Sequence, residues 1–292
     1  MISQKQNQRF YYKLLKSQRV SYSRAKSIRF TKYGVTLLLI IVAPIIFIYK
    51  QESISFIGIL GALWALISFL IGFIESWLVK RAATIQEIYD TELYEIEWNK
   101  VLFGAKIIPH EYINGLTKKY SVSELELNFK DWYEGIDNIE SPLAILICQR
   151  QNIVWDYKLR EIYAFIILGV LIVNFLTGLA LFAFTGETLL NYLLGLILPS
   201  LSAYILGIEE LIGHWKIAKR KKNLENDIMS FVNEAKTDIR SLTISKLREI
   251  QNVIFNERLK APLIPDIVYN RLKKRFSDSS ILSISDIMKL NN

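Results

Sequence analysis

The chain has 292 residues and a formal net charge of +8, and 51% of its residues are hydrophobic while 22% are charged. With a mean hydropathy of +0.24, this composition is typical of a membrane protein that also carries sizeable soluble segments. The single cysteine, Cys148, excludes an intrachain disulfide and a cysteine-built zinc site.

Residues 1–32 form a basic N-terminal arm with nine Lys or Arg and no Asp or Glu. Residues 3–30 are predicted to form an amphipathic helix, because small and apolar side chains recur there at helical spacing. A basic helix with aromatic residues, placed directly before an apolar run, suits the membrane interface. The alternative is a helix docked on the protein's own cytoplasmic part, and the pattern does not separate the two. The stripe consists of Phe10, Leu14, Ser17, Ser21 and Ala25, with Tyr11, Leu15 and Tyr22 nearby.

Four uncharged runs are long enough to span a membrane, which takes about 17–25 apolar residues. Short polar connections join them in pairs, so we expect two transmembrane hairpins, over residues 33–77 and 162–212. Lys and Arg concentrate in the segments that flank the hairpins, which places both termini and the middle segment in the cytoplasm. The sequence contains no cleavable signal pattern. The runs cover residues 33–49, 54–74, 162–186 and 188–208.

Strand patterns are weak everywhere, so the remaining segments, 78–161 and 213–292, are predicted to be cytoplasmic and helical. A helix that begins at Pro142 is expected to continue without a break into the third run. Another long helix is expected to begin at His214. The predicted fold is therefore an all-α membrane protein with four spans. The expected helices cover residues 78–103, 109–120, 142 into the third run, 214–259, 266–275 and 283–290, with a short element at 129–133.

Small residues form a stripe along the second run and a looser stripe along the fourth, and each stripe ends in the pattern Gly-x-x-Glu. In lipid, close approach at small residues drives the association of helices. The stripes therefore predict packing faces, either within one chain or between subunits around a passage. The packing or pore-lining candidates are Gly58, Gly61, Ala65, Ser68, Gly72, Glu75, Gly207 and Glu210.

The glutamates at the ends of the stripes, Glu75, Glu209 and Glu210, have two interpretations. In the first they lie at the membrane boundary and pair with cations nearby in sequence: Lys80, Lys216 or Arg220. In the second, several subunits bring them together as an acidic ring, which favours the passage of cations.

Patterns that indicate an enzyme are absent from the sequence. It contains no Gly-rich phosphate loop, no HExxH and no GxSxG. The two histidines, His110 and His214, lie too far apart in sequence to suggest metal ligands. We therefore predict no catalytic residues, no metal and no cofactor. The basic flanks indicate contact with an anionic lipid bilayer rather than with DNA or RNA.

Residues 142–160 read PLAILICQRQNIVWDYKLR. Together with LLKSQRVSYSRAK at 14–26, AATIQEIYDTELYEIEWN at 82–99 and DWY at 131–133, this segment resembles the SMODS-associated four-transmembrane family of pore-forming effectors. That family accompanies bacterial cyclic-oligonucleotide anti-phage signalling. The resemblance covers nearly the whole chain. It implies an effector in the bacterial inner membrane that senses a cyclic oligonucleotide in its cytoplasmic part, multimerises and permeabilises the membrane.

The same segment carries side chains suited to a cyclic oligonucleotide, because arginine binds phosphate and aromatic rings stack on bases. The candidate ligand-binding residues are Gln149, Arg150, Asn152, Trp155 and Asp156, and either Trp98 with Asn99 or Trp132 with Tyr133 could complete the site. In the alternative interpretation, Trp155 packs in the core and Arg150 pairs with Asp156 or with a neighbouring acid.

A second function is compatible with the same features. The protein could be a constitutive membrane scaffold or regulator that binds a partner protein through its cytoplasmic helices. A small transporter fits less well, because the sequence shows no broken helix and no charge in the middle of a span.

Overall fold

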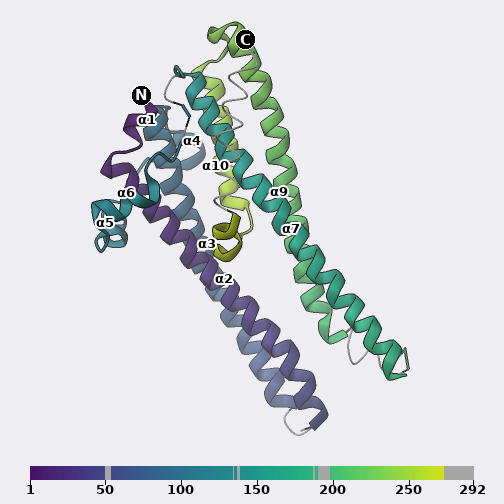
Figure 1. Ribbon diagram of the computed structural model, residues 1–292. Helices are drawn as coiled ribbons and strands as arrows, with labels where there is room; N and C mark the ends of the chain where they lie inside the picture. Colours follow the sequence, from purple (N-terminus) through teal and green to yellow (C-terminus); the bar gives the residue numbers. More distant parts are fainter. Residues whose placement is uncertain (50–53, 134, 137–138, 187, 190–197, 273–292) are drawn as a thin grey trace.

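The computed structural model describes residues 1–49, 54–133, 135–136, 139–186, 188–189 and 198–272. Within these ranges the regular elements are helices and no strand occurs, which confirms the all-α prediction for the described chain. Long helices form two antiparallel pairs, and shorter helices gather at one end of the molecule (Figure 1). We call this packed end the head, and the parts of the long helices that extend beyond it the two arms.

The long helices connect the head to the arms without interruption. The first hairpin consists of α2 (Arg9–Tyr49) and α3 (Ile54–Tyr94), and the second of α7 (Leu143–Thr185) and α9 (Leu198–Thr237). The expected continuity of the helix after Pro142 into the third apolar run is therefore confirmed. Because a helix is a stiff rod, a displacement of its head portion also displaces its arm portion.

The arms expose large apolar side chains, such as Phe73 at 61% and Val173 at 64%. Such surfaces are stable against lipid or another apolar surface rather than against water. Among the described residues, one helix, Leu143–Phe184, is long and apolar enough to cross a membrane, with a mean hydropathy of 2.6 in its most apolar stretch. The four-span architecture therefore stays a prediction.

The main core of the head is a cluster of buried apolar side chains drawn from residues 11–254. Because α2, near the N-terminus, and α10 (Ile244–Lys260), near the end of the described chain, both contribute, the head is a single packed unit. The cluster includes Leu14 and Leu15 of α2, Ile85 and Ile88 of α3, Leu146 and Ile153 of α7, Ile228 and Val232 of α9, and Leu247 and Ile254 of α10.

The basic N-terminal segment, residues 1–32, is docked on the protein itself, which was one of the two alternatives. Leu14, Ser17, Ser21 and Ala25 are all 0% exposed, whereas Phe10 is 36% exposed. The stripe faces α3 together with two short helices, α5 (His110–Thr117) and α6 (Val122–Phe129). The helical spacing of these residues therefore reflects burial in the head.

The helix that continues the second apolar run ends earlier than expected. It ends at Tyr94 rather than at residue 103, because Glu95 adopts a positive φ of 58° that a helix cannot continue through. A separate turn of helix, α4 (Lys100–Phe103), then begins at the cap of Asn99, whose side chain accepts from the backbone N–H of Leu102. Gly104, at φ 75°, ends α4 as predicted for the longer helix.

The prediction of a single long helix over residues 214–259 is wrong. Helix α9 ends at Thr237, a 3-10 turn (Ile239–Ser241) reverses the chain, and α10 runs back between the hairpins (Figure 1). Two caps stabilise the reversal, since Asp238 accepts from the backbone of Arg240 and Thr243 from the backbone of Lys246. The prediction failed because no proline or glycine marks this turn.

A further helix was missed, and two short predicted helices fall near the end of the chain. The short element expected at 129–133 is absent, since residues 130–133 form neither helix nor strand. The missed helix is α6, which precedes them and begins with a capping box in which Ser121 and Glu124 bond reciprocally. The Ser-x-x-Glu spacing was a usable signal. The helix predicted over 266–275 is present as far as the chain is described, over 266–272, while 283–290 lies outside the described residues.

Candidate functional site

A cavity of about 430 Å³ lies in the head between the two hairpins. Its walls come from α2, the segment around Trp132, α7, α10 and the segment that follows α10. Cations outnumber acids in the lining, and several rings face it. The charged lining residues are Arg19, Lys26, Lys130, Arg160, Lys221 and Arg258 against Asp131, Asp156 and Asp266; the rings are Tyr22, Phe129, Trp132, Trp155 and Tyr269.

Three of the five predicted ligand residues line this cavity, namely Asn152, Trp155 and Asp156. They lie at helical spacing on α7, so one face of that helix forms a wall of the cavity. The amide of Asn152 donates to the hydroxyl of Tyr133 at 2.8 Å, which fixes its orientation. The ring of Trp155 lies 4.8 Å from the ring of Tyr269, and both pack against the small apolar cluster of Leu159 and Ile264. This tryptophan therefore lines the cavity and also packs against part of the core, which agrees in part with the alternative interpretation.

The other two predicted ligand residues are held elsewhere. Gln149 is 0% exposed, and its amide donates to the carbonyl of Leu247 at 2.9 Å, which ties α7 to α10. Arg150 forms an ion pair at 2.6 Å with Glu225 of α9. It therefore pairs with a neighbouring acid, which was the alternative interpretation, although that acid is not Asp156.

Of the two additional aromatic pairs, one is near the cavity. Trp132 lines it, and the buried Tyr133 bonds to Asn152 behind it. Trp98 instead donates its ring N–H to the carbonyl of Gly104, and Asn99 caps α4. The structure thus brings Trp132, but neither Trp98 nor Asn99, to the wall that carries Trp155.

The floor of the cavity is an ion-pair group formed by Asp156, Arg160 and Lys221. The Asp156 carboxylate lies 2.6 Å from Arg160 and 2.7 Å from Lys221. Although burial opposes ionisation, the two cations hold the pKa of Asp156 below its usual range. Arg160 also donates to the carbonyl of Pro262 at 2.8 Å and lies 3.1 Å from Nδ1 of His214. Arg160 therefore connects the cavity to the base of the second arm.

A second polar group, which we call the clasp, joins the two hairpins where the arms leave the head. Glu75 of α3 is 5% exposed and accepts from Arg29 at 2.6 Å. Glu210 of α9 accepts from the hydroxyl of Tyr33 at 2.7 Å. These contacts link α2 to helices of both hairpins. The clasp consists of Arg29, Lys32, Tyr33, Glu75, Glu210 and His214.

The partners expected for the two glutamates differ from those observed. Glu75 pairs with Arg29 and Lys32, which lie more than forty residues earlier in the chain, rather than with Lys80. Glu210 lies 3.5 Å from His214 Nε2 and 3.9 Å from Arg29 rather than beside Lys216 or Arg220. Both glutamates are therefore paired within one chain, but with partners that only the packing of the helices brings close. Their position at a membrane boundary stays a prediction.

The structure describes the surroundings of some, but not all, residues of the small-residue stripes. A Cβ on Gly207 would lie 2.8 Å from a methyl of Leu171, so this glycine permits close approach of α7 and α9 within one chain. A Cβ on Gly72 would lie 3.8 Å from Lys32 Nζ, an ordinary contact distance, and Ser68 is half-buried in α3. Gly58, Gly61 and Ala65 belong to the backbone of α3, and their surroundings lie outside the described residues.

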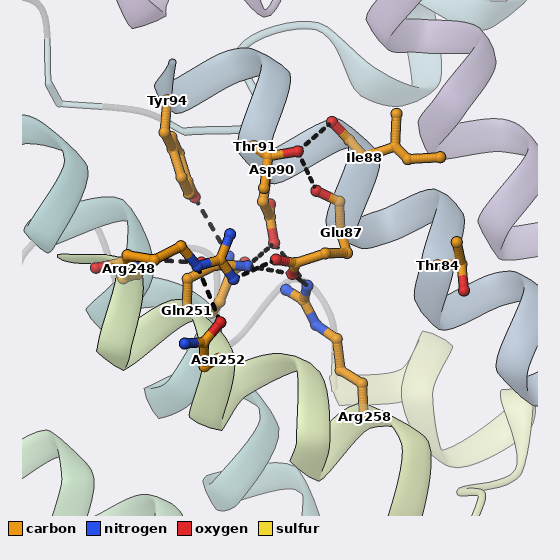
Figure 2. Close-up of polar contacts among 12 residues, drawn as sticks. Thr84, Glu87, Ile88, Asp90, Thr91, Tyr94, Arg248, Gln251, Asn252 and Arg258 are labelled. Carbon is orange, nitrogen blue, oxygen red and sulfur yellow. Dashed lines mark hydrogen bonds and ion pairs between the residues drawn. The ribbon is translucent and has the colours of Figure 1, made fainter. Parts of the chain in front are cut away.

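A buried charge cluster joins α10 to α3 next to the cavity (Figure 2). Glu87 and Asp90 of α3 are 0% and 1% exposed. Arg258 lies 2.6 Å from Asp90, and Arg248 lies 2.6 Å from Glu87. Gln251 donates to both carboxylates, at 2.7 and 2.9 Å. The cluster therefore fixes the returning helix α10, and with it one wall of the cavity.

The buried cluster predicts a pH dependence of stability. Burial and the adjacent Asp90 carboxylate raise the pKa of Glu87 to about 7, against the effect of Arg258 and Arg248. Because the folded pKa lies above the unfolded one, the contribution of Glu87 is complete below pH 4.5 and is lost as pH rises through about 7. We expect the free energy of unfolding to fall by about 1 kcal/mol between pH 6 and pH 8.

Chemical unfolding in detergent micelles at the two pH values tests this expectation. The matched variant is Glu87→Gln, which keeps the shape and an oxygen acceptor for Arg248 but cannot titrate. The pH-dependent difference should shrink in the variant. Equal pH slopes for the two proteins would show that Glu87 does not titrate in this range.

Similarity to known proteins extends over the head and both arms. The family model described as the SMODS-associating 4TM effector domain matches residues 1–284. A "Probable CBASS effector molecule" of Bacillus cereus (strain VD146) is 26% identical over 289 residues, which is 97% of this chain and 96% of that protein. No solved structure matches the chain. The cavity, the clasp and the arms therefore fall within one family domain.

Proposed function

Since this chain belongs to the family of SMODS-associating 4TM effector domains, we propose that it is a membrane effector of a CBASS anti-phage system. A cyclic oligonucleotide binds in the head cavity, and the arms then rearrange, multimerise and permeabilise the bacterial inner membrane. In this proposal both hairpins cross the membrane and the head, with both termini, lies in the cytoplasm. No enzymatic step is required.

The observation that carries the proposal is the cavity itself. It combines six cationic side chains with five rings in a space of about 430 Å³ between the hairpins. Cyclic oligonucleotides present phosphates and flat bases, which such side chains bind by charge-assisted hydrogen bonds and by stacking. Among the lining residues, Arg19 and Lys26 lie on α2 and Trp155 lies on α7. A ligand that contacts all three touches both hairpins at once.

Polar contacts lead from this cavity to the base of the arms. Asp156 holds Arg160, Arg160 lies against His214, and His214 lies against Glu210 of the clasp. A phosphate that competes for Arg160 changes the contacts of His214 and Glu210. For binding to open the arms, the ligand must have a higher affinity for the open arrangement than for the closed one.

Dye release from reconstituted vesicles tests the proposal. The full chain is placed in vesicles of phosphatidylethanolamine and phosphatidylglycerol and exposed to cyclic di-AMP, cyclic di-GMP or cyclic tri-AMP. We expect one of these nucleotides to release the dye and to leave protein-free vesicles intact. If a nucleotide binds without dye leakage, the pore proposal is wrong and a membrane scaffold or regulator becomes the better explanation. If none binds, sensing in the cavity is wrong.

Substitution of Trp155 is expected to weaken nucleotide binding. Stacking on one base contributes about 1–3 kcal/mol, so Trp155→Ala should raise the dissociation constant by about 5- to 150-fold. Arg150→Gln is the matched control from the same helix, because Arg150 is paired with Glu225 and does not line the cavity. Equilibrium binding of the nucleotide that triggers release provides the measurement. Equal affinities for the two variants would place the nucleotide away from Trp155.

A further inference from the structure

The segment after α10 forms one wall of the cavity that the proposed function assigns to a nucleotide. We call residues 261–272 the strap. Leu263 is 5% exposed and packs with Ala25, Leu78 and Val79 of the first hairpin. Ile264, also 5% exposed, packs with Leu159 of the second hairpin. The strap is therefore inserted between the two hairpins.

Asp266 of the strap holds the donors that a phosphate would use. Its carboxylate accepts from Lys26 at 2.6 Å and from the hydroxyl of Ser23 at 2.7 Å. Although burial opposes ionisation, these donors lower the pKa of Asp266, so it is an anion at neutral pH. An ammonium group beside a hydroxyl is a typical donor set for phosphate oxygens. The Asp266 side chain is 41% exposed, so solvent and solutes can reach it.

Tyr269 of the strap takes the position that a base would take. Its ring lies 4.8 Å from the ring of Trp155 at an interplanar angle of 56°. The cationic groups of Arg19 and Lys26 lie 5.7 and 5.4 Å from the same ring. A nucleotide base stacked on Trp155 would need this space.

We propose that the strap is an intramolecular competitor that closes the cavity until a nucleotide displaces it. Asp266 stands where a phosphate binds and Tyr269 stands where a base binds. The nucleotide makes contacts of the same kind as the strap contacts that it replaces, so displacement of the strap costs little free energy. A second phosphate or base of the nucleotide then gives it a higher affinity for the open state than for the closed one. Removal of Leu263 and Ile264 from between the hairpins then frees the arms to move. The proposal rests on the proposed function for the identity of the ligand.

Thiol labelling measures release of the strap without any assumption about pores. The one native cysteine, Cys148, is buried, so Ile264→Cys introduces a reporter that is protected while the strap is closed. In the full chain reconstituted in vesicles, Asp266→Ala should increase the labelling rate of this reporter about tenfold, because it removes two charge-assisted hydrogen bonds. Tyr269→Ala should act in the same direction. Ile267→Ser, a 79% exposed position of the same strap helix, is the control and should leave the rate unchanged.

A second measurement adds cyclic di-AMP, cyclic di-GMP or cyclic tri-AMP to the reporter protein. A nucleotide that releases dye should also accelerate labelling, and it should bind Asp266→Ala more tightly than Ile267→Ser. Unchanged labelling in both Asp266→Ala and Tyr269→Ala would overturn the strap proposal. So would a nucleotide that releases dye while the reporter stays protected. If the variants label faster but no nucleotide acts, the proposed function fails and the strap remains a cover of the cavity.

Discussion

Replacement of Arg258 by methionine is expected to lower the free energy of unfolding by about 3–5 kcal/mol. Arg258 is 8% exposed in its side chain and lies 2.6 Å from Asp90, which is itself 1% exposed. Without the guanidinium, Asp90 is left in a buried site with Gln251 as its main remaining donor. A buried carboxylate that loses its counter-ion carries the full penalty of its desolvation. Chemical unfolding in detergent micelles measures the loss.

The matched control for Arg258 lies on the same helix. Lys246 pairs with Glu234 at 3.6 Å, and both side chains are at least 36% exposed. Lys246→Met should therefore cost no more than about 1 kcal/mol. The double variant Arg258→Met with Asp90→Asn should recover part of the stability, since it removes the unpaired charge. If Arg258→Met is no more harmful than Lys246→Met, the cluster does not hold α10 in place.

Replacement of Glu210 by leucine is expected to raise the leak of dye in the absence of nucleotide by about 10- to 100-fold. Glu210 accepts from Tyr33 and lies near Arg29, so it makes polar contacts between α2 of the first hairpin and α9, and it also lies near His214 of its own helix. Loss of a hydrogen bond to a charged group shifts the equilibrium between closed and open arms by about 1.5–3 kcal/mol. Distances between spin labels at Leu38 and Ile205, both exposed on the arms, report the same opening without a pore.

Two further variants distinguish the clasp hypothesis from the hypothesis of an acidic ring around a passage. Glu209 is the exposed neighbour of Glu210, and Glu209→Leu should leave both the leak and the label distances unchanged. Glu210→Gln keeps an acceptor for Tyr33 and should give a smaller effect than leucine. A ring of glutamates around a passage would behave differently, because Glu210→Gln would then change the cation preference of the current. A shifted reversal potential together with an unaltered closed state would refute the clasp.

The sequence predicted which segment of α7 contributes to the candidate site, but not which residues of that segment line the cavity. The segment from Gln149 to Asp156 was recognised from its mixture of amide, cationic and aromatic groups, and three of its five candidates line the cavity. Spacing on a helix could not tell which face would be buried, so Gln149 and Arg150 were included although they bond to α10 and α9. The cavity residues of α2 and of the strap gave no separate signal, because they approach Trp155 only after the hairpins pack.

The sequence by itself determined the apolar runs, their pairing into hairpins, the helical class and the basic flanks. These features depend on residues close together in the chain, because a helix forms from local spacing and a lipid-facing stretch is defined by its own length and composition. Only the tertiary structure decided the reversal between α9 and α10. That reversal brings Arg258 to Asp90 across 168 positions and the strap between the hairpins. No local sequence pattern predicts these contacts between distant residues, since they form only when the helices bury one shared core.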